Sequence, residues 1–312
     1  MPSLSSLVVV IGTGGTIAGT AARPQDHTGY TAGALSAQAL IAAVPALAGQ
    51  ALESESLAQL DSCDMDHATW VRLALSVQRH LARDDVAGVV ITHGTDTLEE
   101  TALFLHLTVR AQKPVVFTAA MRPASAPSPD GPQNLVDALT LARHAGVHGV
   151  LAVMGGVVHG ASDLRKLHGY RVDAFSSGDA GPVALVQDGQ LRLLRAWPAS
   201  EASCAAALRS DVATWPIVDI VTSHAGARAA TLDALVAAGA RGIVIAGTGN
   251  GSVHAQLMQA ARRAQGQGVR VVRASRCIAG GVVGAPADAL PSAGDLTPAQ
   301  ARVTLMLDLL RG

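Results

Sequence analysis

Residues 7–16, LVVVIGTGGT, decide the fold, because a run of apolar side chains passes at once into a glycine-rich turn. The run from Leu7 to Ile11 is too short to cross a membrane and is typical of a strand buried on both faces. Similar apolar runs recur at 88–92, 114–118, 149–154, 217–223, 242–247 and 269–275. Stretches long enough for helices lie between them, at 67–83, 96–111 and 134–144. Strands that alternate with helices predict βαβ units and a parallel sheet.

The rhythm of strands and helices is interrupted once, by RAWPASEASCAAALRSDVATWP at 195–216. We interpret residues 196–216 as a linker between two domains. The expected fold is therefore α/β, with a doubly wound, flavodoxin-like parallel sheet in a larger N-terminal domain, residues 1–195. A smaller α/β domain is expected at 217–312.

Composition limits the classes of partner. A net charge of −1 without any Lys/Arg run argues against nucleic acid, whose binding needs a basic surface. Nothing in the sequence predicts a membrane partner, so a small polar substrate fits better. The 3 cysteines show no CxxC spacing, which predicts neither a disulfide framework nor a zinc site. The first residues have no basic segment before the apolar run, and we expect a cytoplasmic protein, or a periplasmic one if an export signal has been removed.

Ligands of open α/β sheets bind beyond the carboxyl ends of the strands, so we expect catalytic and binding residues directly after each apolar run. GTGGT (12–16) follows the first run, THGTDTLEE (92–100) follows the second, and GTGNGS (247–252) lies in the C-terminal part. A dinucleotide fingerprint would need glycine at position 17, where Ile17 stands, which weakens a nicotinamide-dependent oxidoreductase. Thr16 is then either a reactive hydroxyl or the cap of a following helix.

Other polar residues also allow two interpretations. Asp96 could cap a helix, with Glu99 completing a capping box, although this does not explain Thr95 at the same strand end. Lys166 is either a solvated surface charge or, beside a carboxylate, a group that accepts a proton or orients a hydroxyl. Tyr30 either pins its glycine-flanked loop or hydrogen-bonds a nucleophile.

These segments, in this order, resemble the bacterial-type L-asparaginase/glutaminase family. The matching stretches are GTGGTIAG (12–19), GYTAG (29–33), DSCDM (61–65), ITHGTDTLEETA (91–102), KPVVFTAAMRP (113–123), DGPQNL (130–135), SDLRK (162–166), GTGNGS (247–252) and LTPAQARV (296–303). The resemblance implies an amidohydrolase that converts L-asparagine to L-aspartate and ammonia without metal or cofactor. It also implies a homotetramer built from intimate dimers, in which a neighbouring subunit completes each site.

The resemblance assigns roles by position. Thr16 looks like the nucleophile, on a mobile loop that closes over substrate, with Tyr30 as its hydrogen-bond partner. Thr95, Asp96 and Lys166 look like a second cluster in which Lys166 polarises Thr95. Backbone N–H groups near the two threonines would form the oxyanion site. The implied substrate contacts are Gly15, Ser62, Cys63, Gly94, Thr95, Asp96, Ala120 and Asn250, with Ser62 and Asp96 holding the α-carboxylate and α-ammonium groups.

The chemistry leaves two questions open. An amide is a poor electrophile, so the site must supply a positioned nucleophile and stabilise an oxyanion. The proton of the threonine hydroxyl can leave through Tyr30, Lys166 or a water molecule. An acyl-enzyme on Thr16 is the preferred route, and direct attack by water is its rival.

Two departures from the family pattern predict weak glutaminase activity. Cys63 follows Ser62 where the family usually has glutamine, and a thiol is the weaker hydrogen-bond partner. The acidic residue that the family contributes across the subunit boundary should fall in 277–295, which contains no glutamate. Asp288 and Asp295 are the candidates there. Glutamine, the longer substrate, depends more on this anchoring to place its amide, so its hydrolysis should be slowed more.

Two functions of other classes use the same scaffold. A subunit of a tRNA-dependent amidotransferase would release ammonia for a partner, but the chain has no long N-terminal extension and no basic face for docking. A non-catalytic amino-acid sensor would have no use for both threonines together with Lys166.

Overall fold

The computed structural model describes residues 7–26, 28–199, 202–284 and 289–312. The chain divides into two compact units, Met1–Leu208 and Arg209–Gly312, so the division falls inside the segment interpreted as a linker. Two short 3₁₀ helices occupy that segment, at Ala205–Arg209 and Val212–Thr214.

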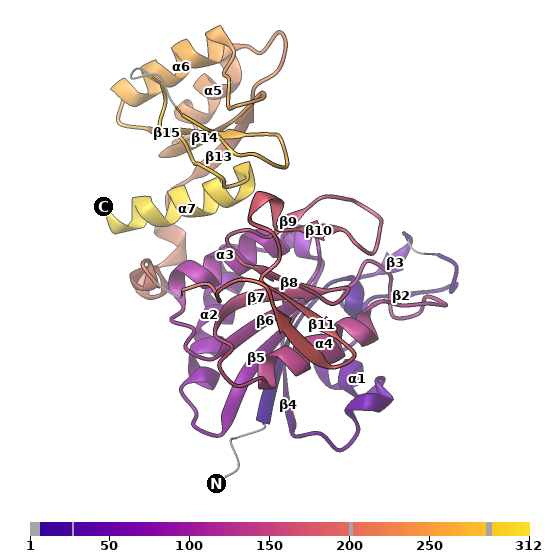
Figure 1. Ribbon diagram of the computed structural model, residues 1–312. Helices are drawn as coiled ribbons and strands as arrows, with labels where there is room; N and C mark the ends of the chain where they lie inside the picture. Colours follow the sequence, from indigo (N-terminus) through magenta and orange to yellow (C-terminus); the bar gives the residue numbers. More distant parts are fainter. Residues whose placement is uncertain (1–6, 27, 200–201, 285–288) are drawn as a thin grey trace. The chain divides into compact units, whose positions relative to one another are not determined.

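The N-terminal unit is built on an eight-stranded sheet with the order β12-β11-β8-β7-β6-β5-β1-β4 (Figure 1). Its parallel strands are β4 (Leu52–Leu60), β1 (Leu7–Gly14), β5 (Val86–Thr92), β6 (Pro114–Thr118) and β7 (Gly149–Met154). Numbered among themselves along the chain, these strands have the order 2-1-3-4-5, which is the flavodoxin-like order that we expected. The strand order reverses at β1, whose neighbours are β4 and β5.

Three antiparallel strands that we did not predict extend this sheet beyond β7. They are β8 (Val157–Gly160), β11 (Ala184–Gln187) and β12 (Gln190–Leu193). The strands are short, and Gly155 and Gly156 form the tight turn between β7 and β8 with φ angles of 56° and 72°. A sheet with one antiparallel side is a common variant of the doubly wound fold.

Helices cover both faces of the sheet. They are α1 (Ala37–Ala42), α2 (His67–Leu81), α3 (Leu98–Thr108) and α4 (Gly131–Arg143). Side chains of α4 pack with Val8, Val10 and Val90 in one buried cluster. Successive strand residues alternate between faces, so Val9 and Ile91 point to the other side, where α2 and α3 lie. Those two helices join through stacked Trp70 and Phe104 rings, 5.0 Å between centroids.

Small paired segments lie outside the main sheet. The antiparallel pair β2 (Thr20–Ala21) and β3 (Tyr30–Thr31) carries Tyr30, and the pair β9 (Arg165–Lys166) and β10 (Phe175–Ser176) carries Lys166. Further 3₁₀ turns lie at Thr16–Ala18, Pro45–Leu47, Ser62–Asp64 and Gly178–Ala180. Two of these turns follow the carboxyl ends of β1 and β4, so they belong to the edge of the sheet where ligands bind.

The C-terminal unit is a parallel three-stranded sheet, β13-β14-β15, with helices packed on it. Its elements are β13 (Val218–Thr222), α5 (Ala229–Ala237), β14 (Gly242–Gly247), α6 (Ala255–Gly266), β15 (Arg270–Ser275) and α7 (Pro298–Arg311). Thr297 and Gln300 form a capping box that starts α7. Within the described ranges of either unit, no helix is long and apolar enough to cross a membrane.

Candidate active site

The loop after β1 places Thr16 against the loop after β5. A Cβ on Gly15 would lie 2.3 Å from the Gly94 Cα, so only glycine allows the two backbones to touch there. Gly15 also has a φ of 78° and donates its N–H to the Leu60 carbonyl at 2.9 Å. Thr16 begins the 3₁₀ turn instead of capping it, which removes the helix-cap interpretation.

Tyr30 is the partner of Thr16. The Thr16 Oγ1 lies 2.6 Å from the Tyr30 Oη, and Thr16 itself is buried. The tyrosine ring packs on Gly19, where an added Cβ would approach the ring to 2.7 Å. The β2–β3 pair, which joins Ala21 to Tyr30, holds the loop in this position. The structure therefore brings together the two hydroxyls that the family resemblance paired.

Lys166 lies beside Thr95 and Asp96, although it is about seventy residues away in the chain. Its Nζ donates to the Thr95 Oγ1 at 2.9 Å and to the Asp96 Oδ1 at 2.5 Å. The Lys166 side chain is only 19% exposed, so it is not the solvated surface charge of the alternative interpretation. Its backbone N–H donates to the Glu99 Oε2 at 3.2 Å. Glu99 thus holds the strand that carries the lysine.

The capping-box interpretation of Asp96 and Glu99 is wrong. Thr97 is the N-cap residue of α3, and no side chain caps this helix. The ammonium of Lys166 bonds the carboxylate of Asp96, while Glu99 accepts from a backbone N–H on β9. Hydrogen bonds from Lys166 to these two carboxylates stand in place of the local capping bonds.

Ser62 joins the turn after β4 to the loop after β5. Its hydroxyl accepts from the Asp96 backbone N–H at 3.1 Å, and its carbonyl accepts from the Thr97 hydroxyl at 2.7 Å. Ser62 is 1% exposed, and its Oγ would lie 2.4 Å from a Cβ on Gly94. Gly15, Gly94 and Ser62 are therefore in contact, with Asp96 beside them.

Ala120 lines the same hollow as Thr95. This hollow is lined by Thr95, Ala119, Ala120, Met121, Asp130, Met154, Val172 and Phe175. The loop after β6 is held in place by the Asp130 carboxylate, which accepts the Met121 and Arg122 N–H groups. Asn134 on α4 adds a bond to the Ala119 carbonyl at 2.9 Å. The loop that forms one wall is thus a fixed part of the site.

Cys63 is exposed at the rim, next to the carboxylate of Asp96. Partial loss of water around the thiol, together with the carboxylates of Asp61, Asp64 and Asp96, raises the pKa of Cys63. The side chain is therefore a neutral thiol at neutral pH. A thiol is a poor hydrogen-bond partner for a substrate's ammonium group.

Asn250 belongs to the C-terminal unit. Its amide bonds the backbone of Val283 in both directions, donating to the carbonyl and accepting from the N–H, each at 2.7 Å. Asp295 lies against Gly281 in the same unit. Asp288 lies outside the described residues.

His93 was given no role by the sequence pattern, although it stands between the strand and Gly94. Its side chain is fully buried, and burial lowers the pKa of His93 to about 4. The imidazole Nδ1 lies 2.7 Å from the Gly94 carbonyl oxygen. The signal in the sequence was its position directly before the glycine that touches the other loop.

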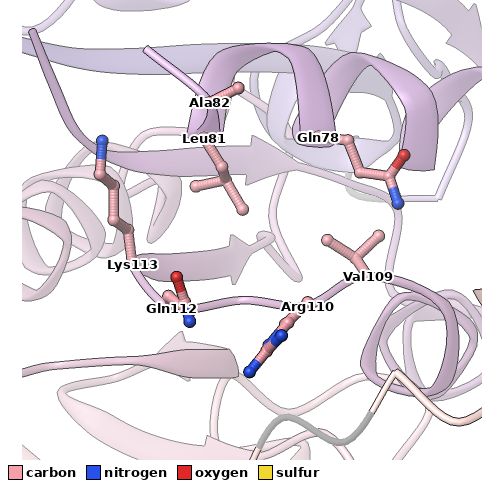
Figure 2. A pocket seen from close by; sticks show the side chains of 7 residues that line it. All are labelled: Gln78, Leu81, Ala82, Val109, Arg110, Gln112 and Lys113. Carbon is pink, nitrogen blue, oxygen red and sulfur yellow. The ribbon is translucent and has the colours of Figure 1, made fainter. Parts of the chain in front are cut away.

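A second hollow lies far from these residues along the sheet. Figure 2 shows it between the last turns of α2 and the segment that follows α3, lined by Gln78, Leu81, Ala82, Val109, Arg110, Gln112 and Lys113. The Lys113 Nζ donates to the Arg83 carbonyl at 2.5 Å. No group of three or more metal-ligating side chains occurs within the described ranges. The threonine-lined edge is therefore the candidate site.

Two hydroxyls, one carboxylate and one ammonium meet at this edge. Among the residues that the structure describes, the backbone N–H of Thr95 has no hydrogen-bond acceptor. A donor of this kind, free beside a buried hydroxyl, can stabilise an oxyanion. The arrangement suits attack by a hydroxyl on a carbonyl carbon.

Comparison with known proteins identifies both parts of the chain. A family model for the asparaginase N-terminal domain matches residues 7–199, and one for the glutaminase/asparaginase C-terminal domain matches 217–312. The chain is 37% identical to the probable periplasmic L-asparaginase of Haemophilus influenzae, covering 97% of this chain and 88% of the relative. It is 36% identical to L-asparaginase 2 of Escherichia coli, again over 97% and 88%.

One relative and one solved structure extend the comparison. The glutaminase-asparaginase of Pseudomonas fluorescens is 35% identical, over 97% of this chain and 86% of the relative. The crystal structure of a probable cytoplasmic L-asparaginase from Campylobacter jejuni superposes with a TM-score of 0.91 at 38% identity. That alignment covers 98% of this chain and 95% of the other.

Proposed function

The chain belongs to the bacterial-type L-asparaginase family, and from that premise we propose that it hydrolyses L-asparagine to L-aspartate and ammonia with a threonine hydroxyl as nucleophile. The observation that carries the proposal is the contact between Gly15 and Gly94, which brings the Thr16–Tyr30 pair beside the Thr95–Lys166 pair. Substrate is held by Ser62 and Asp96 through its α-carboxylate and α-ammonium groups. Removing Asp96 should cost on the order of 2–5 kcal/mol of binding, because a buried charge of the substrate loses its partner.

In the proposed first step, the Thr16 Oγ1 attacks the side-chain carbonyl carbon of asparagine. The Tyr30 Oη is the atom through which the hydroxyl proton can leave, since it lies 2.6 Å from the Oγ1. The negative charge that develops on the amide oxygen is received by backbone N–H groups of the two loops. The carbon–nitrogen bond breaks, the nitrogen gains a proton and leaves as ammonia, and an aspartyl ester remains on Thr16.

In the second step, water attacks the ester carbonyl and releases aspartate. Lys166 holds the Thr95 hydroxyl at 2.9 Å and can thereby polarise it towards the same carbonyl. The hydroxyl of Thr16 is regenerated when it regains a proton. Lys166 also bonds Asp96, so the lysine couples the carboxylate that holds substrate to the second threonine.

The relatives' names divide between asparaginase and glutaminase-asparaginase, and we assign this chain the weaker glutaminase activity. The neutral thiol of Cys63 supports this, because it leaves the ammonium group of a longer substrate less firmly held. We further propose a cytoplasmic homotetramer in which Asn250 lies at the edge that crosses the subunit boundary.

The test is ammonia release from L-asparagine by the purified protein and its Thr16→Ala variant. We expect a loss of about 10³-fold or more, because removing a nucleophile removes covalent catalysis. Thr13→Val is the matched control, since Thr13 is also buried, lies near the end of β1, and uses its hydroxyl to bond the Thr92 carbonyl at 3.0 Å. Full activity in Thr16→Ala, or absence of activity in the wild type, would contradict the proposal.

A further inference from the structure

His93 is anchored directly before the loop that carries Gly94 and Thr95. It follows the last residue of β5, and its backbone N–H donates to the Thr118 carbonyl at 3.0 Å. Its ring meets Phe117 edge-on, with 5.8 Å between centroids. No part of its side chain reaches solvent. The position of the imidazole ring is therefore fixed by its buried surroundings at the carboxyl end of β5.

The hydrogen bond from His93 defines which nitrogen carries the proton. The Nδ1 lies 2.7 Å from the Gly94 carbonyl oxygen, and a carbonyl oxygen only accepts, so the Nδ1 must carry the hydrogen. Burial lowers the pKa of the ring to about 4, so the ring is neutral at physiological pH and has one N–H. The Nε2 is then a bare acceptor, and it has no partner in the described part of the chain. Within the described residues, the one hydrogen bond of the ring is the bond to the Gly94 carbonyl.

Holding the Gly94 carbonyl also orients Thr95. The carbonyl of Gly94 and the N–H of Thr95 belong to one trans peptide unit, in which the two groups point in opposite directions. Because the carbonyl points to the buried ring, the N–H points away from that ring. The next N–H along the chain, that of Asp96, is already bonded to Ser62. The Thr95 N–H is thus a donor without an acceptor in the described chain, beside a threonine hydroxyl.

We propose that His93 is a positioning residue, which aims the Thr95 N–H at the amide oxygen of the substrate by fixing the Gly94–Thr95 peptide. This inference rests on the proposed function. His93 touches neither substrate nor the hydroxyls, and it transfers no proton. Its contribution is to keep the donor in the orientation that the developing oxyanion needs, so that no reorganisation is required during the reaction.

The test compares His93→Leu with His93→Asn. Leucine fills the space without a donor, whereas the asparagine amide can place an N–H where the Nδ1 was. In His93→Leu we expect kcat to fall about 10- to 100-fold while KM stays within about threefold, because a donor to developing charge acts mainly in the transition state. His93→Asn should return kcat to within about fivefold of the wild type.

His80→Leu is the matched control. His80 is also a buried histidine with a hydrogen bond, but its partner is the Glu55 carboxylate on β4, away from the threonine loops. It should retain the wild-type kcat. The proposal is overturned if His93→Leu keeps the wild-type kcat, if His93→Asn loses as much as His93→Leu, or if His80→Leu loses equally.

A second measurement needs no variant. In ¹⁵N spectra of the histidine-labelled wild-type protein, one ring should show a protonated Nδ1 and a bare Nε2, unchanged between about pH 5 and about pH 8. Absence of such a ring contradicts the proposal. Ammonia release by the wild-type protein separates failure of this inference from failure of the proposed function. If the wild type is active and His93→Leu has the same kcat, only the role of His93 is refuted. If the wild type is inactive, the proposed function is refuted as well.

Discussion

The large sheet carries charged clusters in two regions, and they differ in how completely they are bonded. At the carboxyl ends of β1 and β5, Lys166 bonds Thr95 and Asp96. On the edge strand β4, the carboxylate of Glu55 accepts from Ser76, Arg79 and His80, all on α2, at 2.7–2.8 Å. In the β4 cluster, all three donors meet one carboxylate oxygen, the Glu55 Oε2. The threonine cluster keeps the Thr95 N–H without an acceptor among the described residues.

This difference shows what separates a site from a structural network. Charge is present in both regions, and a buried histidine stands in both, His80 in one and His93 in the other. Only the threonine edge combines unused donors with glycines that let two loops touch, at the point where the strand order reverses. Substitutions there should change catalysis, and substitutions on β4 should change stability.

Among variants that compare the two clusters, the largest effect is expected for Lys166→Met. The loss of the ammonium leaves the Thr95 hydroxyl unpolarised, and we expect kcat to fall about 10²- to 10⁴-fold. Asp96 is 54% exposed, so water can solvate its carboxylate and the fold should survive. Arg79→Met, which removes the matching cation of the β4 cluster, should leave kcat unchanged. Equal kcat values for the two variants in an ammonia-release assay would contradict the claim that only the Lys166 cluster serves catalysis.

A smaller effect is expected for Tyr30→Phe. The ring still packs on Gly19, but the Thr16 hydroxyl loses its 2.6 Å partner. We expect kcat to fall about 10- to 100-fold with KM nearly unchanged, because the hydrogen bond matters most when the proton leaves. Steady-state kinetics separate the two parameters. A rise in KM at constant kcat would assign Tyr30 to binding instead.

Cys63→Gln tests whether the residue after Ser62 limits the activity on glutamine. An amide at this position adds a hydrogen-bond acceptor near Asp96, and one bond of about 1 kcal/mol corresponds to about a fivefold gain in kcat/KM for glutamine. In the wild type, kcat/KM for glutamine should be well below that for asparagine. Cys63→Ala is the control for loss of the thiol alone. Comparable values for both substrates in the wild type would refute the specificity argument.

The smallest effect on catalysis is expected for Glu55→Gln. Burial alone would raise the pKa of Glu55, but hydrogen bonds from His80, Ser76 and Arg79 outweigh it and hold the pKa below the ordinary 4.5. A lowered folded pKa stabilises the protein above pH 4.5 and loses that contribution as the pH falls through the folded value. Glu55→Gln should therefore lose about 1 kcal/mol of unfolding free energy at neutral pH and less in acid, with kcat unchanged. Urea unfolding at several pH values measures this, and a pH-independent loss would contradict it.

The sequence predicted those parts of the fold that depend on continuous burial. The strands β1, β5, β6 and β7 were recognisable because their side chains are apolar on both faces. The edge strand β4, LESESLAQL, was missed because only one of its sides packs, and its glutamates look like a loop. The helix α4 begins at Gly131 and not at Asn134, because Pro132 is favourable in a first turn.

The members of the candidate site were predictable from motifs, but their bonds were not. Asp96 and Glu99 have the spacing of a capping box, and local pattern alone could not show that Lys166, about seventy residues away, would take both as partners. The contact between Gly15 and Gly94 likewise depends on the parallel pairing of β1 with β5. The role inferred for His93 depends on one peptide orientation, which no residue pattern encodes.

Rapid-quench mass spectrometry during turnover of L-asparagine can show whether Thr16 forms an ester on the substrate carbonyl carbon. Acid quenching within the first turnover, followed by peptide mapping, should find one aspartyl group on the peptide that contains Thr16. The same peptide from Thr16→Ala should carry none. An aspartyl group on a peptide from another part of the chain, or turnover without any ester at any quench time, would rule out Thr16 as the nucleophile.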